Sequence, residues 1–333
     1  MNARSFWVEQ PGVGGLRTEV LPTLGPGQVR VRTLFTGVSR GTESLVFRGR
    51  VPLNQYAAMQ CPHQVGEFST PIKYGYIAVG VVEEGGGMEG QNVFCLYPHQ
   101  DCFVVDRSAV VALPKGMDPA LAVLASNLET AVNGCWDADP TPNDTVTIIG
   151  AGVVGILVAW RIQAETGRPV ELVDIDPGRA PVAAHLGLAF SSPQRAMSGR
   201  SLVVHASGSQ AGLRSALELA GPEGRIIEMS WFGDREVSLP LGEHFHSRRL
   251  TIQCSQVGAL PPRMRGEWTY VKRMALVLSL LSEHPELAIL INSEGSFDSL
   301  PETMSRLAEA GAGADTIAFM ATNDFDKAHA AIS

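Results

Sequence analysis

Alternating hydrophobic and polar residues dominate the first part of the chain and give way to helical spacing from Pro119. Four early segments are rich in β-branched residues and bounded by glycine and proline, a pattern typical of short antiparallel strands. We therefore expect a small β-rich domain that ends near Gly116, with no long helix before Asp118. The four segments are residues 28–38, 74–83, 93–96 and 110–113.

Residues 145–174, TVTIIGAGVVGILVAWRIQAETGRPVELVD, predict a buried strand, a glycine turn, an apolar helix and a second strand. Gly150, Gly152 and Gly155 suit a tight turn, a close backbone approach to a pyrophosphate, and packing of the helix on the sheet. We predict nicotinamide cofactor binding, with Asp174 accepting hydrogen bonds from the ribose; a glycine-rich turn in another α/β domain is the alternative. Because a carboxylate repels a 2′-phosphate, NAD(H) is favoured over NADP(H), although Arg179 could reach such a phosphate.

Further strands and helices complete a doubly wound region. Strands are expected at 201–206, 225–230 and 251–256, helices at 268–281 and 300–310, and a strand at 316–321 that returns to the first domain. The third β-α unit is short. We place the nucleotide-binding domain at 117–258 and the other domain at 1–116 plus 259–333.

Composition describes an ordinary globular protein of 333 residues, with 45% hydrophobic and 18% charged residues. A net charge of −8 without a long basic cluster argues against a nucleic-acid partner. We find no apolar run of ~18 to 20 residues and no signal-peptide segment, so we expect a cytoplasmic enzyme with no membrane association. The cysteines are scattered, as expected of reduced thiols.

Several motifs resemble the medium-chain dehydrogenase/reductase superfamily: LFTGVSRGTE at 34–43, KYGYIAVGVVEEG at 73–85, the GAGVVG turn and HASGSQAGLRSALELAGPEGRIIEMS at 205–230. The resemblance implies an α/β protein with an N-terminal GroES-like β-rich catalytic domain and a doubly wound Rossmann domain. GVSRGTESLVFRGRVP and KYGYIAVG look most like the subgroup containing 3-hydroxyethyl bacteriochlorophyllide dehydrogenase. We carry over its oxidation of a secondary alcohol, and not its tetrapyrrole substrate.

Zinc-using relatives place a cysteine where this chain has Ser39, a histidine at Tyr76 and a third ligand near Asn127. Neutral hydroxyls are poor zinc ligands, and Glu129 could supply only one carboxylate. The resemblance therefore implies a zinc-free member with no metal site.

Without zinc, hydrogen-bond donors or a general acid must stabilise the reacting oxygen. Tyr76 is the predicted donor, or else a core tyrosine. Ser39 and Thr42 can relay protons or bind local backbone. Glu43 is a catalytic candidate or a partner that pairs with Arg40 or orders the turn. His99 is an acid–base candidate or a structural histidine, and the same two interpretations apply to His205 and His246.

The resemblance also assigns residues to the cofactor. Arg40 matches a position where relatives contact the pyrophosphate, and Ser207 lies in the HASGS motif. The full predicted set is Gly150, Gly152, Val153, Val154, Gly155, Asp174, Arg179, Arg40 and Ser207.

The chain between Ser39 and Tyr76 is longer than the family's ligand spacing. The added segment either covers the active site or forms a surface loop with its own small core. It carries Tyr56, Met59, Cys61 and Phe68, which suit a sizeable, partly apolar substrate in the interdomain cleft. We predict hydride transfer between nicotinamide and a secondary alcohol or ketone. A quinone or enone reductase and a catalytically silent NAD(H)-binding redox sensor are the alternatives. We expect a homodimer.

Overall fold

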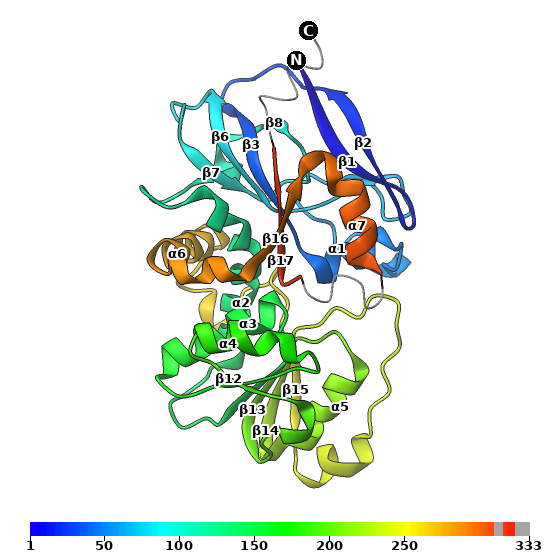
Figure 1. The fold of residues 1–333 in the computed structure, drawn as a ribbon, viewed down its shortest axis with the longest axis vertical. Helices are drawn as coiled ribbons and strands as arrows, with labels where there is room; N and C mark the ends of the chain where they lie inside the picture. Colours follow the sequence, from blue (N-terminus) through cyan, green and yellow to red (C-terminus); the bar gives the residue numbers. More distant parts are fainter. Residues whose placement is uncertain (310–315, 324–333) are drawn as a thin grey trace. The chain divides into compact units, whose positions relative to one another are not determined.

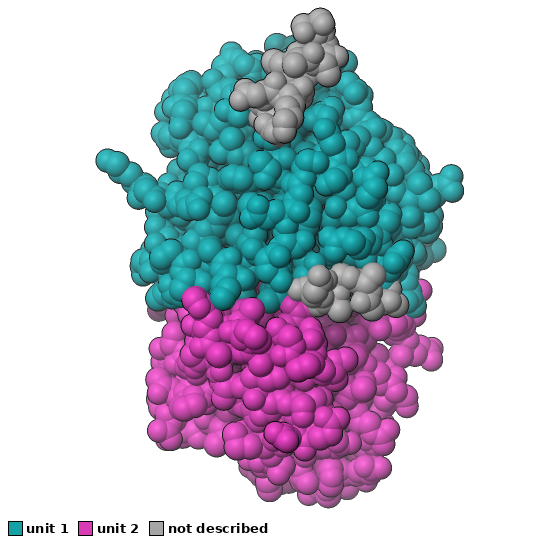
Figure 2. Space-filling model, in the orientation of Figure 1, with its two compact units in different colours: residues 1–126, 274–333 teal, residues 127–273 magenta. Residues whose placement is uncertain are grey.

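The computed structural model describes residues 1–309 and 316–323. The chain divides into two compact units, residues 1–126 with 274–333 and residues 127–273 (Figure 2). Two predicted segments extend beyond the described residues, the end of the 300–310 helix at Ala310 and the C-terminal stretch from residue 324. None of the helices in the described part combines the length and the apolar character that crossing a lipid bilayer requires.

Unit 1 is β-rich, as the alternation predicts. Its seven-stranded sheet has the order β16-β17-β3-β6-β7-β9, with β8 also paired to β3, and a four-stranded sheet has the order β2-β1-β5-β4. A core between the strands includes Val29, Val31, Val82 and Phe103. The strands are β1 (Asn2–Gln10), β2 (Val13–Val20), β3 (Gln28–Val38), β4 (Val65–Gly66), β5 (Ile72–Lys73), β6 (Ala78–Glu84), β7 (Asn92–Cys95), β8 (Cys102–Asp106), β9 (Val110–Ala112), β16 (Ile291–Ser296) and β17 (Ala318–Thr322).

The C-terminal strand β17 pairs antiparallel with β3, so Phe319 lies opposite Val38. The predicted return of this strand to the first domain is confirmed. Helix α7 (Leu300–Ala308) lies against α1 (Arg40–Phe47) and β2 in the same unit (Figure 1).

Unit 2 contains a parallel six-stranded sheet in the order β12-β11-β10-β13-β14-β15. This is the strand order of a doubly wound nucleotide-binding fold, in which ligands bind where the order reverses, beside the first strand. The predicted fold class is confirmed. The strands are β10 (Val146–Ile149), β11 (Glu171–Val173), β12 (Ala189–Ser191), β13 (Arg200–His205), β14 (Ala220–Glu228) and β15 (Thr251–Cys254).

The third β-α unit is short, as expected, because α4 (Ala180–His185) and β12 are brief. The longer helices are α2 (Ala125–Ala138), α3 (Val153–Thr166), α5 (Gln210–Leu219) and α6 (Tyr270–Glu283); α2 and α6 cross the limits of the two units.

The structure differs from the sequence analysis at α1. The sequence predicts a turn after Ser39, yet the eight residues Arg40–Phe47 form a helix. Its buried side includes Glu43 beside Leu45, Val46 and Phe47. A carboxylate on the buried side interrupts the hydrophobic spacing that would have predicted a helix.

The units also divide at residues 126 and 273, whereas the sequence places the limits at 116 and 258. The segment that follows residue 258 stays with unit 2 through side-chain contacts. Trp268 packs on Trp136, with ring centroids 4.8 Å apart, and the Tyr270 hydroxyl donates to the Gly258 carbonyl at 2.8 Å. The contact between Trp136 and Trp268 joins residues far apart in sequence and leaves no local pattern.

Candidate functional site

The glycine bend that follows β10 is built so that side chains are excluded from it. Gly150 has a φ of +108°, and a Cβ there would lie 2.7 Å from the backbone of Ser207. A Cβ at Gly155 would lie 1.8 Å from the Gly150 carbonyl oxygen. At Gly152 a Cβ would meet no described atom within 4 Å. Gly150 and Gly155 are thus required by packing, whereas Gly152 borders open space.

Helix α3 begins at Val153, with Gly152 as its N-cap. Glycine has no side chain with which to cap the first turn, so the amides around Val153 and Val154 face toward whatever occupies the open space. Such a helix N-terminus suits an anionic diphosphate. The predicted residues of the bend are brought together by the structure.

Asp174 follows β11 and lies against this bend. Its Oδ2 accepts a hydrogen bond from the Ala151 N–H at 2.6 Å, and its Oδ1 accepts one from the Asp176 N–H at 2.9 Å. Each carboxylate oxygen has a further lone pair, so Asp174 can also accept from ribose hydroxyls.

Arg179 occupies the short helix after β11 and is buried. Its Nε lies 3.2 Å from the Asp176 Oδ2. The ion pair directs the Arg179 guanidinium toward the carboxylate of Asp176. Asp176 lies between Asp174 and Arg179 in the sequence. Arg40, the other predicted cationic contact, lies at the start of α1 in unit 1 and donates to the Thr316 carbonyl at 3.4 Å.

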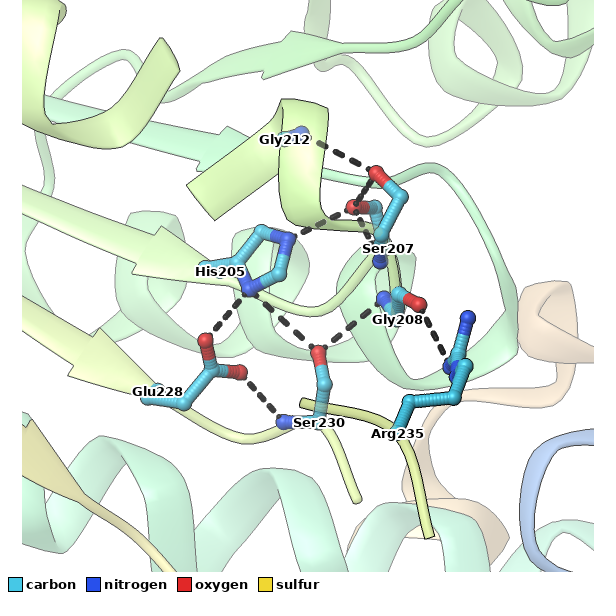
Figure 3. Close-up of polar contacts among 8 residues, drawn as sticks. His205, Ser207, Gly208, Gly212, Glu228, Ser230 and Arg235 are labelled. Carbon is cyan, nitrogen blue, oxygen red and sulfur yellow. Dashed lines mark hydrogen bonds and ion pairs between the residues drawn. The ribbon is translucent and has the colours of Figure 1, made fainter. Parts of the chain in front are cut away.

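Ser207 follows β13 and forms part of a network that extends to Glu228, the last residue of β14 (Figure 3). The Ser207 Oγ lies 2.6 Å from the His205 Nε2, and the His205 Nδ1 lies 2.7 Å from the Glu228 Oε2. Glu228 was not among the predicted site residues. Its only sequence signal is its place at the end of a strand next to β13.

A second polar network lies in unit 1 at the start of α1. Ser39 is the N-cap of the helix, and its N–H donates to the Glu43 Oε1 at 2.7 Å. The Glu43 Oε2 lies 2.6 Å from the His99 Nε2, and both side chains are buried. Glu43 therefore orders the turn, as one of the alternatives held, and it pairs with His99.

The positions of the hydrogen atoms in this network can be derived from Thr36, which lies at the end remote from Glu43. The Thr36 hydroxyl donates to the Ile77 carbonyl at 2.7 Å, so it can only accept from the His99 Nδ1, 2.7 Å away. The Nδ1 hence carries a hydrogen. The Glu43 Oε2 and the Nε2, 2.6 Å apart, are joined by one hydrogen bond.

Tyr76 adjoins this network through the hydroxyls of Ser39 and Thr42, with which its phenol forms hydrogen bonds. Burial raises the pKa of the phenol well above its ordinary value, and the nearby charge of Glu43 raises it further. Tyr76 therefore keeps its proton at neutral pH and can act as a hydrogen-bond donor. The structure brings all five predicted catalytic residues, Tyr76, Ser39, Thr42, Glu43 and His99, into one cluster.

The added segment contributes a chain of aromatic rings that ends at Tyr76. Ring centroids are 5.4 Å apart for Tyr56 and Phe68, 5.6 Å for Phe68 and Tyr74, and 6.0 Å for Tyr74 and Tyr76. Cys61 joins them with its Sγ 3.3 Å from the Gly75 carbonyl, and burial raises the pKa of its thiol to about 12. The segment thus packs on the Tyr76 cluster.

The donor set around Tyr76 does not suit zinc. Positions 39 and 76 offer neutral hydroxyls, and the carboxylate and imidazole nearby, Glu43 and His99, are bonded to each other. In residues 1–309 and 316–323 no three His, Cys, Asp or Glu side chains gather closely enough to hold a metal ion. Glu129 pairs with the buried Arg273, with its Oε1 3.0 Å from the guanidinium.

No protein-family profile matches the sequence. Among curated proteins, 5-exo-hydroxycamphor dehydrogenase of Pseudomonas putida is 30% identical over 223 residues, covering 61% of this chain and 59% of that protein. The match therefore spans about three fifths of the length of this relative.

Solved structures match over nearly the whole chain. An alcohol dehydrogenase (rspB) of Escherichia coli complexed with NADH has a TM-score of 0.74 at 18% identity, covering 96% of this chain and 99% of that one. A putative zinc-binding dehydrogenase of Sinorhizobium meliloti bound to NADP has a TM-score of 0.75 at 17% identity, covering 97% and 99%.

The curated relative and both solved structures are named as dehydrogenases. The two structures agree with the two-unit architecture of this chain. The predicted superfamily fold is confirmed.

Proposed function

We propose that this protein is an NAD(H)-dependent, zinc-independent oxidoreductase that interconverts a secondary alcohol and its ketone on a sizeable, partly apolar substrate. The observation that carries the proposal is the glycine bend, where open space at Gly152 meets the first turn of α3 and the carboxylate of Asp174. The activity named for the hydroxycamphor relative, a dehydrogenase acting on a hydroxylated apolar compound, supports the substrate class.

The bend holds the cofactor diphosphate through the backbone amides of residues 151–155, and Asp174 binds the adenosine ribose. A 2′-phosphate would meet the carboxylate of Asp174, which is already held against the bend, so NAD(H) is the preferred form. The bound nicotinamide supplies or accepts the hydride.

In unit 1, the Tyr76 phenol donates a hydrogen bond to the substrate oxygen and stabilises the negative charge that develops there. In alcohol oxidation the phenol passes its own proton to Ser39 or Thr42, whose hydroxyls are bonded to it, as it takes up the hydroxyl proton of the substrate. Ketone reduction reverses both transfers. Glu43 and His99 are positioning residues. They fix the start of α1. Burial keeps the phenol protonated by raising its pKa, and the charge of Glu43 adds to this effect.

Purified protein tests this proposal with NAD and a panel of bulky secondary alcohols, followed by absorbance of reduced nicotinamide, alongside ketones and enones with NADH. Turnover of alcohols and ketones is the expected result, and reduction of enones alone would assign the protein to the C=C reductases. NADH binding without any turnover would favour the redox sensor, and absence of NADH binding would refute the proposal altogether.

Tyr76→Phe tests the assignment of the donor. Losing a single stabilising donor costs roughly 10²- to 10³-fold in kcat. Tyr74→Phe is the matched control, because it removes a hydroxyl from the neighbouring ring of the same aromatic chain. Near-normal turnover by Tyr76→Phe would remove the phenol from the mechanism.

A further inference from the structure

The network at the ends of β13 and β14 has a connectivity that neither the fold nor the proposed reaction requires. His205 is fully buried between an exposed serine, Ser207, and a carboxylate, Glu228 (Figure 3). The second oxygen of Glu228 accepts a hydrogen bond from the Ser230 N–H at 2.6 Å, which holds the carboxylate in place.

The protonation of His205 decides what Ser207 can do. Glu228 accepts from the Nδ1–H, so in the neutral imidazole the Nε2 is an acceptor and takes the Ser207 hydroxyl hydrogen. When the imidazole is protonated, the Nε2–H donates to the Ser207 oxygen instead.

The second lone pair of that oxygen faces the Ser209 N–H, 3.3 Å away. The Ser209 Oγ also lies 2.9 Å from the Ser207 Oγ, and either hydroxyl can donate to the other. Beside the imidazolium the Ser207 hydroxyl hydrogen is released from the Nε2, so Ser207 can donate to a ligand or to Ser209. Beside neutral His205 that hydrogen is bonded to the Nε2, and Ser207 offers a ligand only its oxygen as an acceptor.

The network lies at the glycine bend. The Cα and N of Ser207 approach the position of a Gly150 Cβ to within 2.7 Å. On the other side, a Cβ at Gly212 of α5 would lie 2.3 Å from the Ser207 Oγ and 2.8 Å from the His205 Nε2. The helix can close over the network only because residue 212 is glycine.

Among the described residues, few charged or titratable groups lie near the His205 imidazole. Glu228 on β14 is the direct partner, and Cys254 lies beside it on β15. After β14, Phe232 stacks on the imidazole with centroids 6.2 Å apart, and Arg235 lies over Phe232 and donates to the Gly208 carbonyl at 2.9 Å. On β10 the neighbour in register is the apolar Ile149.

We propose that His205 is a positioning residue for the cofactor, which acts through Ser207 so that binding of the anionic dinucleotide takes up a proton. The inference rests on the proposed cofactor site. With neutral His205 the site presents an acceptor oxygen and the uncompensated charge of Glu228 to the diphosphate. With charged His205 it presents an O–H donor and a neutralised pair, so the bound state favours the imidazolium.

The sign of the pH dependence follows. A ligand that binds better when His205 is protonated raises the proton affinity of His205 by the same factor. The dissociation constant of NADH should therefore rise with pH over the range in which the imidazolium of His205 loses its proton. One linked proton limits the rise to about tenfold per pH unit.

Isothermal titration of the full chain with NADH, in two buffers of different ionisation enthalpy near neutral pH, measures the protons taken up. The wild-type protein should take up a substantial fraction of one proton. His205→Asn keeps a donor toward Glu228 but does not titrate, so its uptake should fall to near zero and its affinity should no longer depend on pH. Adenosine, which carries no phosphate, should bind without the proton.

Two further variants keep the test decisive. Ser207→Ala leaves the imidazole intact but removes the hydroxyl that couples it to the ligand, so uptake should also fall. His284→Asn removes a histidine that pairs with Glu286 in unit 1 and should leave uptake unchanged. Equal uptake by wild-type, His205→Asn and Ser207→Ala proteins would overturn the inference while leaving the cofactor site standing. Absence of NADH binding by the wild-type protein would overturn the proposed function as well.

Discussion

Adding one methyl group at two positions of the glycine bend separates cofactor binding from folding. At Gly155 the new Cβ would lie 1.8 Å from the Gly150 carbonyl oxygen, which is backbone and cannot turn aside. At Gly152 the Cβ enters open space, and the backbone there, with φ −76° and ψ 176°, suits any L-residue. We predict that Gly155→Ala damages the fold of unit 2 and that Gly152→Ala damages only NADH binding.

The magnitudes follow from these contacts. Overpacking of this kind costs about 1–3 kcal/mol, and each kcal/mol lowers the melting temperature of a domain of this size by about 2–4 °C. Gly152→Ala should change stability by less than about 1 kcal/mol, the scale of an N-cap exchange. Its methyl group blocks the approach of the diphosphate to the α3 amides. A hydrogen bond to a charged group contributes about 1.5–3 kcal/mol, so the loss of one weakens NADH binding about tenfold or more.

The assay pairs differential scanning fluorimetry without ligand with a fluorescence titration of NADH. The expected pattern is a lowered melting temperature for Gly155→Ala, and for Gly152→Ala a near-normal melting temperature with weakened binding. If Gly152→Ala bound NADH as tightly as the wild-type protein, the open space at residue 152 would not be the diphosphate site.

Two other substitutions test the buried charges. Glu43→Gln removes the negative charge that helps to raise the pKa of Tyr76, so the phenol should ionise at lower pH; an ultraviolet difference titration measures this, and an unchanged titration would show that Glu43 does not act on Tyr76. Arg273→Ala leaves the buried Glu129 without its partner, and because burial already raises the pKa of Glu129, we expect a loss of about 3–5 kcal/mol in denaturant unfolding. The double variant Arg273→Met with Glu129→Gln should recover much of that loss, and failure to recover would place the cost elsewhere than in the uncompensated charge.

The fold of unit 2 could be predicted from sequence because its signals are local. Val146 to Ile149, the three glycines and Asp174 lie within one β-α-β unit. Gly150 and Gly155 stand where a Cβ would not fit. The six-strand order follows from the same alternation of strands and helices. The ion pair of Arg179 with Asp176 could not be predicted in this way. It depends on a helix of three residues, which is too short to give a periodic pattern of hydrophobic residues.

The polar networks could be predicted only in part. The resemblance placed Ser39, Thr42 and Tyr76 together, but nothing local links Glu43 to His99, which lies on a loop far along the chain and reaches it through the sheet pairing. The partnership of His205 and Glu228 likewise arises from the parallel register of β13 and β14. Such contacts follow from topology and become visible only once the strands are aligned.

Turnover measured against metal content tests the central claim most directly. The protein would be exhaustively chelated, its zinc per chain determined by mass spectrometry, and NAD-dependent oxidation of its best alcohol substrate measured before and after zinc is returned. We predict full turnover with far less than one metal ion per chain and no gain on adding zinc. Turnover lost with the metal and restored by one equivalent of zinc would contradict the account.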